Sequence, residues 1–148
     1  MTENYDPENP FAKIIRGEGP AHVVHEDDEV LAFLDVFPQS PGHVLVVPKS
    51  GEPRTLLDAT PEQLTAVVHV VQRVARAVTD ELGPAGVQIV QFNEAAAGQT
   101  VFHLHFHVIP RYDAADLLPH AGVRADDGRL GELQRRISSR LAAQRPPA

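Results

Sequence analysis

Histidine alternates with an apolar residue over a short run in the last third of this chain. Residues 103–109 read His-Leu-His-Phe-His-Val-Ile. Because successive side chains of a β-strand point to opposite faces, the run predicts a strand that carries His103, His105 and His107 on one face, roughly 6.5–7 Å apart. The apolar residues between them would face a hydrophobic core. A row of imidazoles on an anchored strand favours phosphate chemistry or metal binding over packing.

The phosphate interpretation gives the central histidine the chemical work. A single histidine on a strand is commonly a partly buried structural residue, but three at strict alternation indicate a site. His105 would attack phosphorus, while its neighbours donate hydrogen bonds to phosphoryl and leaving-group oxygens. A neutral imidazole is a nucleophile near pH 7, and a cluster of imidazoles resists simultaneous protonation.

A metal site is the alternative, because three imidazoles with an open fourth position match catalytic zinc. On a straight strand, however, His103 and His107 lie roughly 13 Å apart. Both cannot then reach one ion at about 2.1 Å. The spacing therefore favours phosphate contacts, and the site is predicted to need no metal and no other cofactor, with a metal-dependent hydrolase kept as an alternative.

Composition limits the class of protein. A chain of 148 residues with 43% hydrophobic content predicts a single domain over residues 1–148. The net charge of −7 disfavours nucleic acid as a partner. The polar, acidic stretch from Met1 to Pro10 does not resemble a signal peptide, and no apolar run approaches the roughly 20 residues that cross a bilayer. With no cysteine for disulfides, we expect a soluble, cytoplasmic protein without a membrane partner.

Apolar spacing and turn residues predict an antiparallel α+β fold. Its longest helix is signalled by Thr60, Pro61 and Gln63 at the start and by Gly83-Pro84 at the end. The valine-rich stripe of that helix comprises Leu64, Val67, Val68, Val71, Val74, Val78 and Leu82. The other predicted elements are a short helix at 11–17, strands at 22–26, 30–36, 43–47, 87–93 and 103–110, a loop at 37–42, and a final helix with Leu130, Leu133, Ile137 and Leu141 on one side.

The histidine run resembles the signature His-φ-His-φ-His-φ-φ, with φ apolar, of the histidine triad (HIT) nucleotide hydrolases and transferases. Gly98-Gln99-Thr100 is similar to the phosphate loop of that family. The resemblance is to bacterial HIT-like proteins and covers about residues 10–112, with a C-terminal extension and helix at about 113–148. Further matching segments are 11–15, 26–28 with 31–35, and 43–49.

The resemblance implies a HIT-like five-stranded antiparallel sheet with one long and one or two shorter helices, and a homodimer. It gives His105 the role of nucleophile and places His107 at the phosphate and leaving-group oxygens. His103 and His43 would support them through hydrogen bonds. Asp35 would accept from the ribose hydroxyls. The remaining nucleotide-binding residues would be Phe11, Ile14, Phe33 and Val36 at the base, and Asn93, Gly98, Gln99 and Thr100 at the phosphate.

Each binding role has a structural alternative. The four residues assigned to the base could be ordinary core, and Asp35 could cap the turn that follows it. Asn93 could be a turn residue, and Gly98 could serve only a backbone with positive φ. His22, His25 and His120 have no pattern that supports a role, and His69 is predicted to lie on the exposed face of the long helix.

Departures from the family pattern also matter. Residues 9–12 replace the cysteine pair that helps some relatives bind a structural zinc, so that zinc is not expected. Ala95 stands near the Asn where relatives often have glycine, which puts the phosphate contacts in doubt. His107 is glutamine in many transferases, so its presence favours hydrolysis.

The predicted function is therefore hydrolysis at the α-phosphorus of a nucleotide conjugate, such as a phosphoramidate, an acyl-adenylate or a dinucleoside polyphosphate. A covalent nucleotidyl-histidine would form and release a nucleoside monophosphate such as AMP. The expected ligand is a purine nucleotide, and the leaving group would meet the segment from Tyr112 onward or a dimer partner. The alternative from another class is a nucleotide-binding regulatory protein with incidental turnover.

Overall fold

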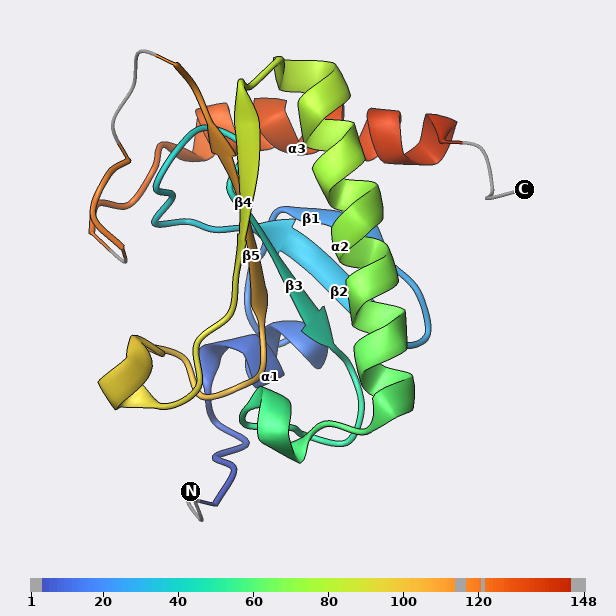
Figure 1. Cartoon of the computed structure of the whole chain (residues 1–148), viewed down its shortest axis with the longest axis vertical. Coiled ribbons are helices and arrows are strands. Elements are labelled where there is room, and N and C mark those ends of the chain that lie inside the picture. The colour runs from blue at the N-terminus through green and yellow to red at the C-terminus, as the bar shows by residue number, and fades with distance from the viewer. Residues whose placement is uncertain (1–3, 114–116, 121, 145–148) are drawn as a thin grey trace.

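The computed structural model describes residues 4–113, 117–120 and 122–144. Its five strands form one antiparallel sheet, as predicted, and their order in it is β1-β2-β3-β5-β4 (Figure 1). The strands are β1 Val23–Glu26, β2 Val30–Leu34, β3 Val44–Pro48, β4 Gly86–Val90 and β5 Phe106–Arg111. The helices are α1 Pro10–Ile15, α2 Pro61–Leu82 and α3 Asp127–Ala143, with 3₁₀ turns η1 Leu56–Asp58 and η2 Ala95–Ala97.

Helix α2 begins and ends where its sequence signals predict. The Thr60 side chain accepts from the Gln63 amide, the Gln63 side chain accepts from the Thr60 amide, and Gly83 ends the helix at φ 63°. One member of the predicted stripe is wrong, because Val68 is 50% exposed while Val70 is buried in its place. No helix in the part of the chain that the structure describes is long and apolar enough to span a bilayer.

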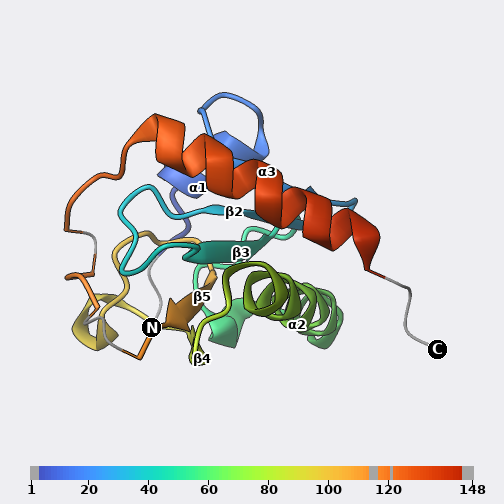
Figure 2. The ribbon, with the colours of Figure 1, turned by 90° about the horizontal axis from the view of Figure 1, so that it is seen from above.

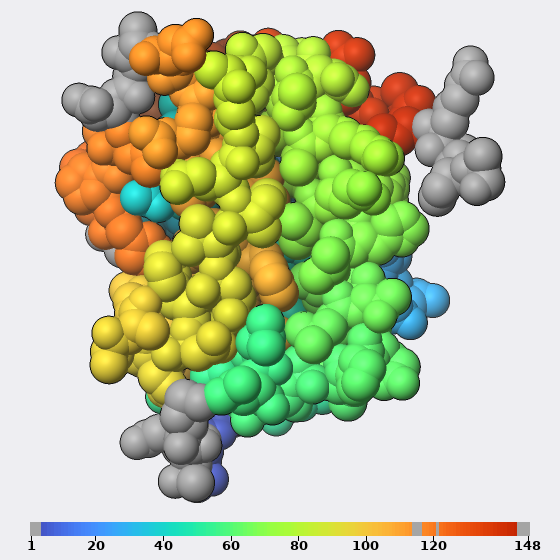
Figure 3. Space-filling model, viewed as in Figure 1, coloured from blue at the N-terminus to red at the C-terminus, as the bar shows by residue number. Residues whose placement is uncertain are grey.

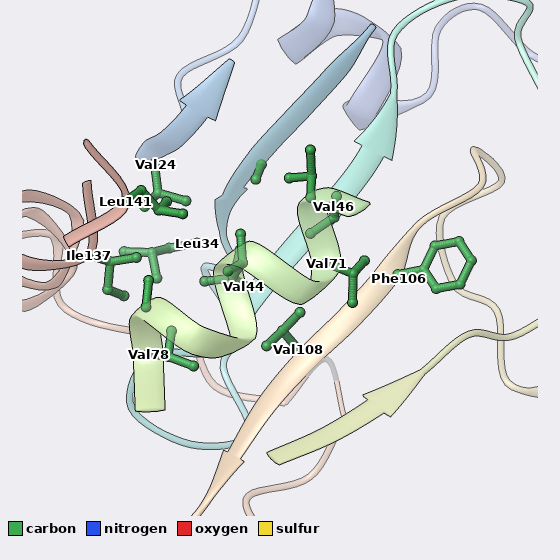
Figure 4. Close-up of a cluster of buried hydrophobic side chains, with 14 of the residues drawn as sticks. Val24, Leu34, Val44, Val46, Val71, Val78, Phe106, Val108, Ile137 and Leu141 are labelled. Carbon is green, nitrogen blue, oxygen red and sulfur yellow. The ribbon is translucent and has the colours of Figure 1, made fainter. Parts of the chain in front are cut away.

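The main core lies between the sheet and the two longer helices. Figure 2 shows α2 nearly end-on and α3 along its length, so the two helices cross. Side chains from both helices meet alternate residues of β2, β3 and β5 in this core (Figure 4). As predicted, α3 buries Leu130, Leu133, Ile137 and Leu141 there.

A smaller core covers the opposite face of the sheet. Phe11 of α1 packs there with Leu31 and Phe33 of β2 and with Leu45 and Val47 of β3. Leu45 is the register partner of a β5 histidine, so the histidine face of β5 lies on this side of the sheet, beside α1.

The predicted strand over residues 103–110 is wrong at its start, because β5 begins at Phe106. The Leu104 amide donates to the Pro53 carbonyl at 2.8 Å, and the carbonyl of His103 accepts from a side chain, so neither group joins a ladder. The alternation of faces still holds, since Leu104, Phe106 and Val108 all enter the main core. Strands β2 and β4 also end earlier than predicted, at Leu34 and Val90.

Candidate active site

A cavity of about 520 Å³ opens on the α1 face of the sheet. Its lining joins α1 and β2 to the loop after β2, to residues 100–101 and to the segment that follows β5. Most of the residues that the sequence singles out meet there, namely Phe11, Ile14, Phe33, Asp35, Val36, Thr100, His105 and His107.

The backbone fixes the proton of His105. Its Nδ1 lies 2.7 Å from the carbonyl oxygen of His103, and a carbonyl only accepts, so Nδ1 carries the hydrogen and Nε2 carries the lone pair. Burial lowers the pKa of His105 to about 4, and the residue is 4% exposed, with its ring perpendicular to that of Phe11. The residue is therefore a neutral imidazole with Nε2 unprotonated at pH 7.

A second chain of hydrogen bonds fixes the proton of His107. The backbone amide of Gln39 donates to His43 Nδ1 at 3.0 Å, so neutral His43 carries its hydrogen on Nε2. His43 Nε2 lies 2.9 Å from His107 Nδ1 and donates to it, which leaves the His107 hydrogen on Nε2. Burial and neighbouring imidazoles lower the pKa of His43 to about 3 and that of His107 to about 2. The ring centroids of His105 and His107 are 5.0 Å apart, and both residues line the cavity, one with a free lone pair and the other with an N–H.

His103 stands behind the cavity and positions its neighbour. Its Nε2–H donates to the Pro48 carbonyl at 2.9 Å, and its Nδ1 accepts from the Tyr5 hydroxyl at 2.6 Å. Burial lowers its pKa, so it too is neutral. Tyr5 was not identified from sequence, because its partner is 98 residues away.

Asp35 caps the turn that follows it and also lines the cavity. Its Oδ1 accepts from the Phe37 amide at 2.8 Å and so caps the turn, while the residue also lines the cavity. Its Oδ2 lies 3.5 Å from His43 Nε2, and burial raises the pKa of the carboxyl to about 6. An acceptor for hydroxyl groups thus lies at the cavity wall.

Three residues assigned to the phosphate stand outside the cavity lining. The Gln99 side chain is turned inward, where its Nε2 donates to the carbonyls of Arg54 and Val101 at 2.9 and 3.0 Å. Asn93 Oδ1 accepts from the Leu56 amide at 2.9 Å. Gly98 adopts φ 105°, which suits glycine. Of this loop, Thr100 reaches the cavity.

Two lining residues come from the segment after β5, in which no sequence pattern supports a role for His120. Arg124 lines the cavity, and so does His120, whose ring centroid is 5.3 Å from that of His107 and 5.7 Å from that of Phe92. No local pattern marks His120, since only the tertiary fold brings it to the triad. His69 is exposed on α2, as predicted.

One group has the composition of a metal site. Among the described residues, ligand atoms of Asp35, His43 and His107 lie within 4.8 Å of one another, and only one of these three belongs to the strand histidines. The hydrogen bonds oppose this use. If His43 bound an ion through Nε2, its remaining hydrogen would sit on Nδ1 and face the donating amide of Gln39, whereas metal-bound histidines present that hydrogen to an acceptor. The group fits a hydrogen-bonded relay better than a metal centre.

Known proteins place this geometry in a family. The HIT domain matches residues 16–114. Protein hit of Bacillus subtilis is 41% identical over 133 residues, which cover 89% of this chain and 90% of that protein. Adenylylsulfatase HINT3 of Arabidopsis thaliana is 42% identical over 101 residues, which cover 68% of this chain and 51% of that protein.

Solved structures agree. A Hit-like protein of Bartonella henselae, described as involved in cell-cycle regulation, superposes with a TM-score of 0.88 at 46% identity, covering 93% of this chain and 99% of that one. A zinc-bound histidine triad protein of Mycobacterium smegmatis gives 0.78 at 36% identity, covering 91% and 94%. A histidine triad nucleotide-binding protein of Candida albicans gives 0.68 at 32% identity, covering 91% and 98%. The chain therefore belongs to the HIT domain family.

Proposed function

We propose that this protein hydrolyses nucleotide conjugates at the α-phosphorus through a nucleotidyl-His105 intermediate. The proposal depends on one observation: hydrogen bonds fix which ring nitrogen carries the hydrogen in His105 and in His107. The His103 carbonyl leaves His105 Nε2 as a bare lone pair, and the His43 relay leaves His107 Nε2 as a donor next to it. A protein that only binds nucleotides has no need of a nucleophile and a donor set side by side.

The cavity suggests how the nucleotide lies. Phe11, Ile14, Phe33 and Val36 form an apolar slot for a flat base, and we expect a purine there. Asp35 stands where it accepts from ribose hydroxyls, and Thr100 stands toward the phosphate. This order puts the α-phosphorus against His105.

The reaction then proceeds in two displacements. His105 Nε2 forms a bond to phosphorus, and the bond from phosphorus to the leaving group breaks with its electron pair on the leaving atom. The His107 N–H stabilises charge on the phosphoryl or leaving oxygen. Water next attacks phosphorus, the P–N bond returns its pair to His105, and a nucleoside monophosphate and a proton are released. An adenylylsulfatase and a nucleotide-binding protein among the relatives support this chemistry.

Trapping the intermediate tests the proposal. Adenosine 5′-phosphosulfate is mixed with the protein and quenched in alkali, in which P–N bonds persist. We expect intact mass spectrometry to show an adenylyl adduct on the wild type, mapped to the peptide with His105, and none on His105→Ala. An adduct on another residue would contradict the proposal. Turnover without an initial burst, and with no adduct at any time, would also contradict it.

We also propose that two copies of this chain form a dimer in which their β4 strands lie side by side. We expect the protein to be cytoplasmic. Strand β4 is an edge of the sheet, and its residue Ile89 is 47% exposed. Val68 of α2 is a second exposed apolar residue, at 50%. Exposed apolar residues on an open edge favour pairing with a second strand.

Sedimentation equilibrium should therefore give twice the chain mass of 16.1 kDa. Ile89→Asp should shift the protein to the monomer at micromolar concentration, because a carboxylate is costly to bury in an interface. Leu57→Asp, at a site 63% exposed on η1, should leave the dimer intact. A monomeric wild type would overturn this assembly.

A further inference from the structure

Aromatic rings form a continuous series from the base slot to the C-terminal segment. Centroid separations are 4.9 Å from Phe11 to His105, 5.0 Å from His105 to His107 and 5.3 Å from His107 to His120. In the proposed reaction the base occupies the Phe11 end and phosphorus faces His105. The leaving group then departs on the side of His107, where His120 is the next ring.

At that end of the series, donors and acceptors lack partners. His107 Nε2 and both ring nitrogens of His120 are enclosed, and none has a hydrogen-bond partner among residues 4–113, 117–120 and 122–144. Enclosed polar groups without partners cost free energy and are uncommon in folded proteins. Because His107 Nε2 carries a hydrogen, a ligand that brings oxygen acceptors would satisfy it and His120 together.

The segment that carries His120 is held against the site. Leu118 exchanges hydrogen bonds with Gln39, through its amide to the Gln39 carbonyl at 2.9 Å and through its carbonyl from Gln39 Nε2 at 3.2 Å. The Ala125 amide donates to the Val36 carbonyl at 2.8 Å. In Figure 3 a few cyan atoms, from the chain near residue 40, lie against the orange atoms of this part of the surface. His120 is therefore fixed between two anchors.

The charges of the lining suit an anion. Lys13 and Arg124 line the cavity, and Asp35 is the one carboxylate among the lining residues that the structure describes. This local balance contrasts with the net charge of −7 of the whole chain. Arg124 is also paired with Asp127 at 3.0 Å, and Lys13 with Glu8 at 3.6 Å, but both pairs are about half exposed or more and so weak.

We propose that His120 recognises the leaving group and selects nucleotide conjugates whose leaving group is an oxygen-rich anion, such as sulfate, phosphate or polyphosphate. This inference rests on the proposed function and names its substrate class. When His105 attacks, the P–O bond breaks and its pair stays on the leaving oxygen, which departs as a stable anion and needs no proton. An N–H of His120 donates to an oxygen of that anion. A neutral amine leaving group offers no anionic oxygen to accept it.

Two classes of substrate test the role. Values of kcat/KM are measured for adenosine 5′-phosphosulfate and diadenosine tetraphosphate, and for adenosine 5′-phosphomorpholidate, whose leaving group is a neutral amine. We expect His120→Leu to lower kcat/KM about 10- to 100-fold on the anionic class, the loss of one hydrogen bond to a charged group. The loss on the morpholidate should be at least tenfold smaller. His120→Gln keeps an N–H donor and should recover most of the anionic activity.

A binding measurement keeps the inference separate from turnover. In calorimetry, the β-phosphate of ADP occupies the place of an anionic leaving group, so His120→Leu should lower the preference for ADP over AMP about tenfold. His69→Leu, at an exposed histidine of α2, is the matched control for both assays and should match the wild type.

The outcomes discriminate between the two proposals. If the wild type turns over none of the three compounds, the proposed function fails, and the ADP to AMP ratio still decides the role of His120. If the wild type is active but His120→Leu slows both classes equally or neither, this inference alone is overturned. A loss confined to the morpholidate would also overturn it, since His120 would then be protonating an amine.

Discussion

Substitution of His105 by alanine is expected to lower kcat at least about 1,000-fold, because the covalent route then has no nucleophile. Residual turnover would come from the donors and the binding energy that remain. The affinity for AMP should stay within about tenfold, since the base slot and Asp35 lie elsewhere in the cavity. Steady-state kinetics on adenosine 5′-phosphosulfate and calorimetry with AMP measure the two quantities.

The matched control for this loss is His69→Ala, on the exposed face of α2. It removes an imidazole without touching the cavity and should keep full activity. Unchanged turnover in His105→Ala would remove the nucleophile assignment. Tight AMP binding with negligible turnover in the wild type would instead favour the regulatory, nucleotide-binding alternative.

Acid should destabilise this protein in a range where most domains are stable. Burial holds the pKa values of His43, His105 and His107 at about 3, 4 and 2, below the usual 6.5. Below pH 6.5 the unfolded chain therefore binds more protons than the folded chain, so this stabilisation is complete above that pH and is lost as the pH falls. Asp35 acts in the opposite direction between pH 6 and 4, because burial raises its pKa to about 6.

Three histidines outweigh one carboxyl, so the free energy of unfolding should fall by roughly 2–4 kcal/mol from pH 7 to pH 5. Urea unfolding at the two pH values measures it. His107→Gln removes one titrating group, and its stability should change less over the same interval. Stability that is flat or rises from pH 7 to pH 5 would show that these imidazoles are not held neutral.

Local signals made most of the fold predictable. The ends of α2 depend on Thr60, Gln63 and Gly83, which act on their immediate neighbours. The start of β5 was missed because the Leu104 amide pairs with Pro53, about fifty residues earlier, and no local pattern encodes that bond. The alternation of histidine and apolar residues therefore predicts the face of each side chain correctly. It does not predict the residue at which β5 begins to pair with its neighbouring strands.

The site residues likewise fall into those that local motifs predict and those that depend on tertiary contacts. His105, His107, the apolar slot and Asp35 follow from short motifs and do meet in one cavity, with His103 behind it. Tyr5 and His120 come from outside the segments that resemble the family, and their roles depend on contacts across the fold. The inward turn of Gln99 was equally hidden, because the carbonyls that hold its amide belong to Arg54 and Val101.

Peptide groups, rather than side chains, decide where the hydrogens sit on His43, His103 and His105. A codon change can replace any side chain, but it cannot delete a carbonyl, and it deletes an amide hydrogen only by introducing proline. For the relay alone, position 39 therefore tolerates every residue except proline, which would remove the amide that donates to His43 and so release the tautomers of His43 and His107. The protonation pattern of the site therefore depends on the path of the backbone more than on the neighbouring side chains.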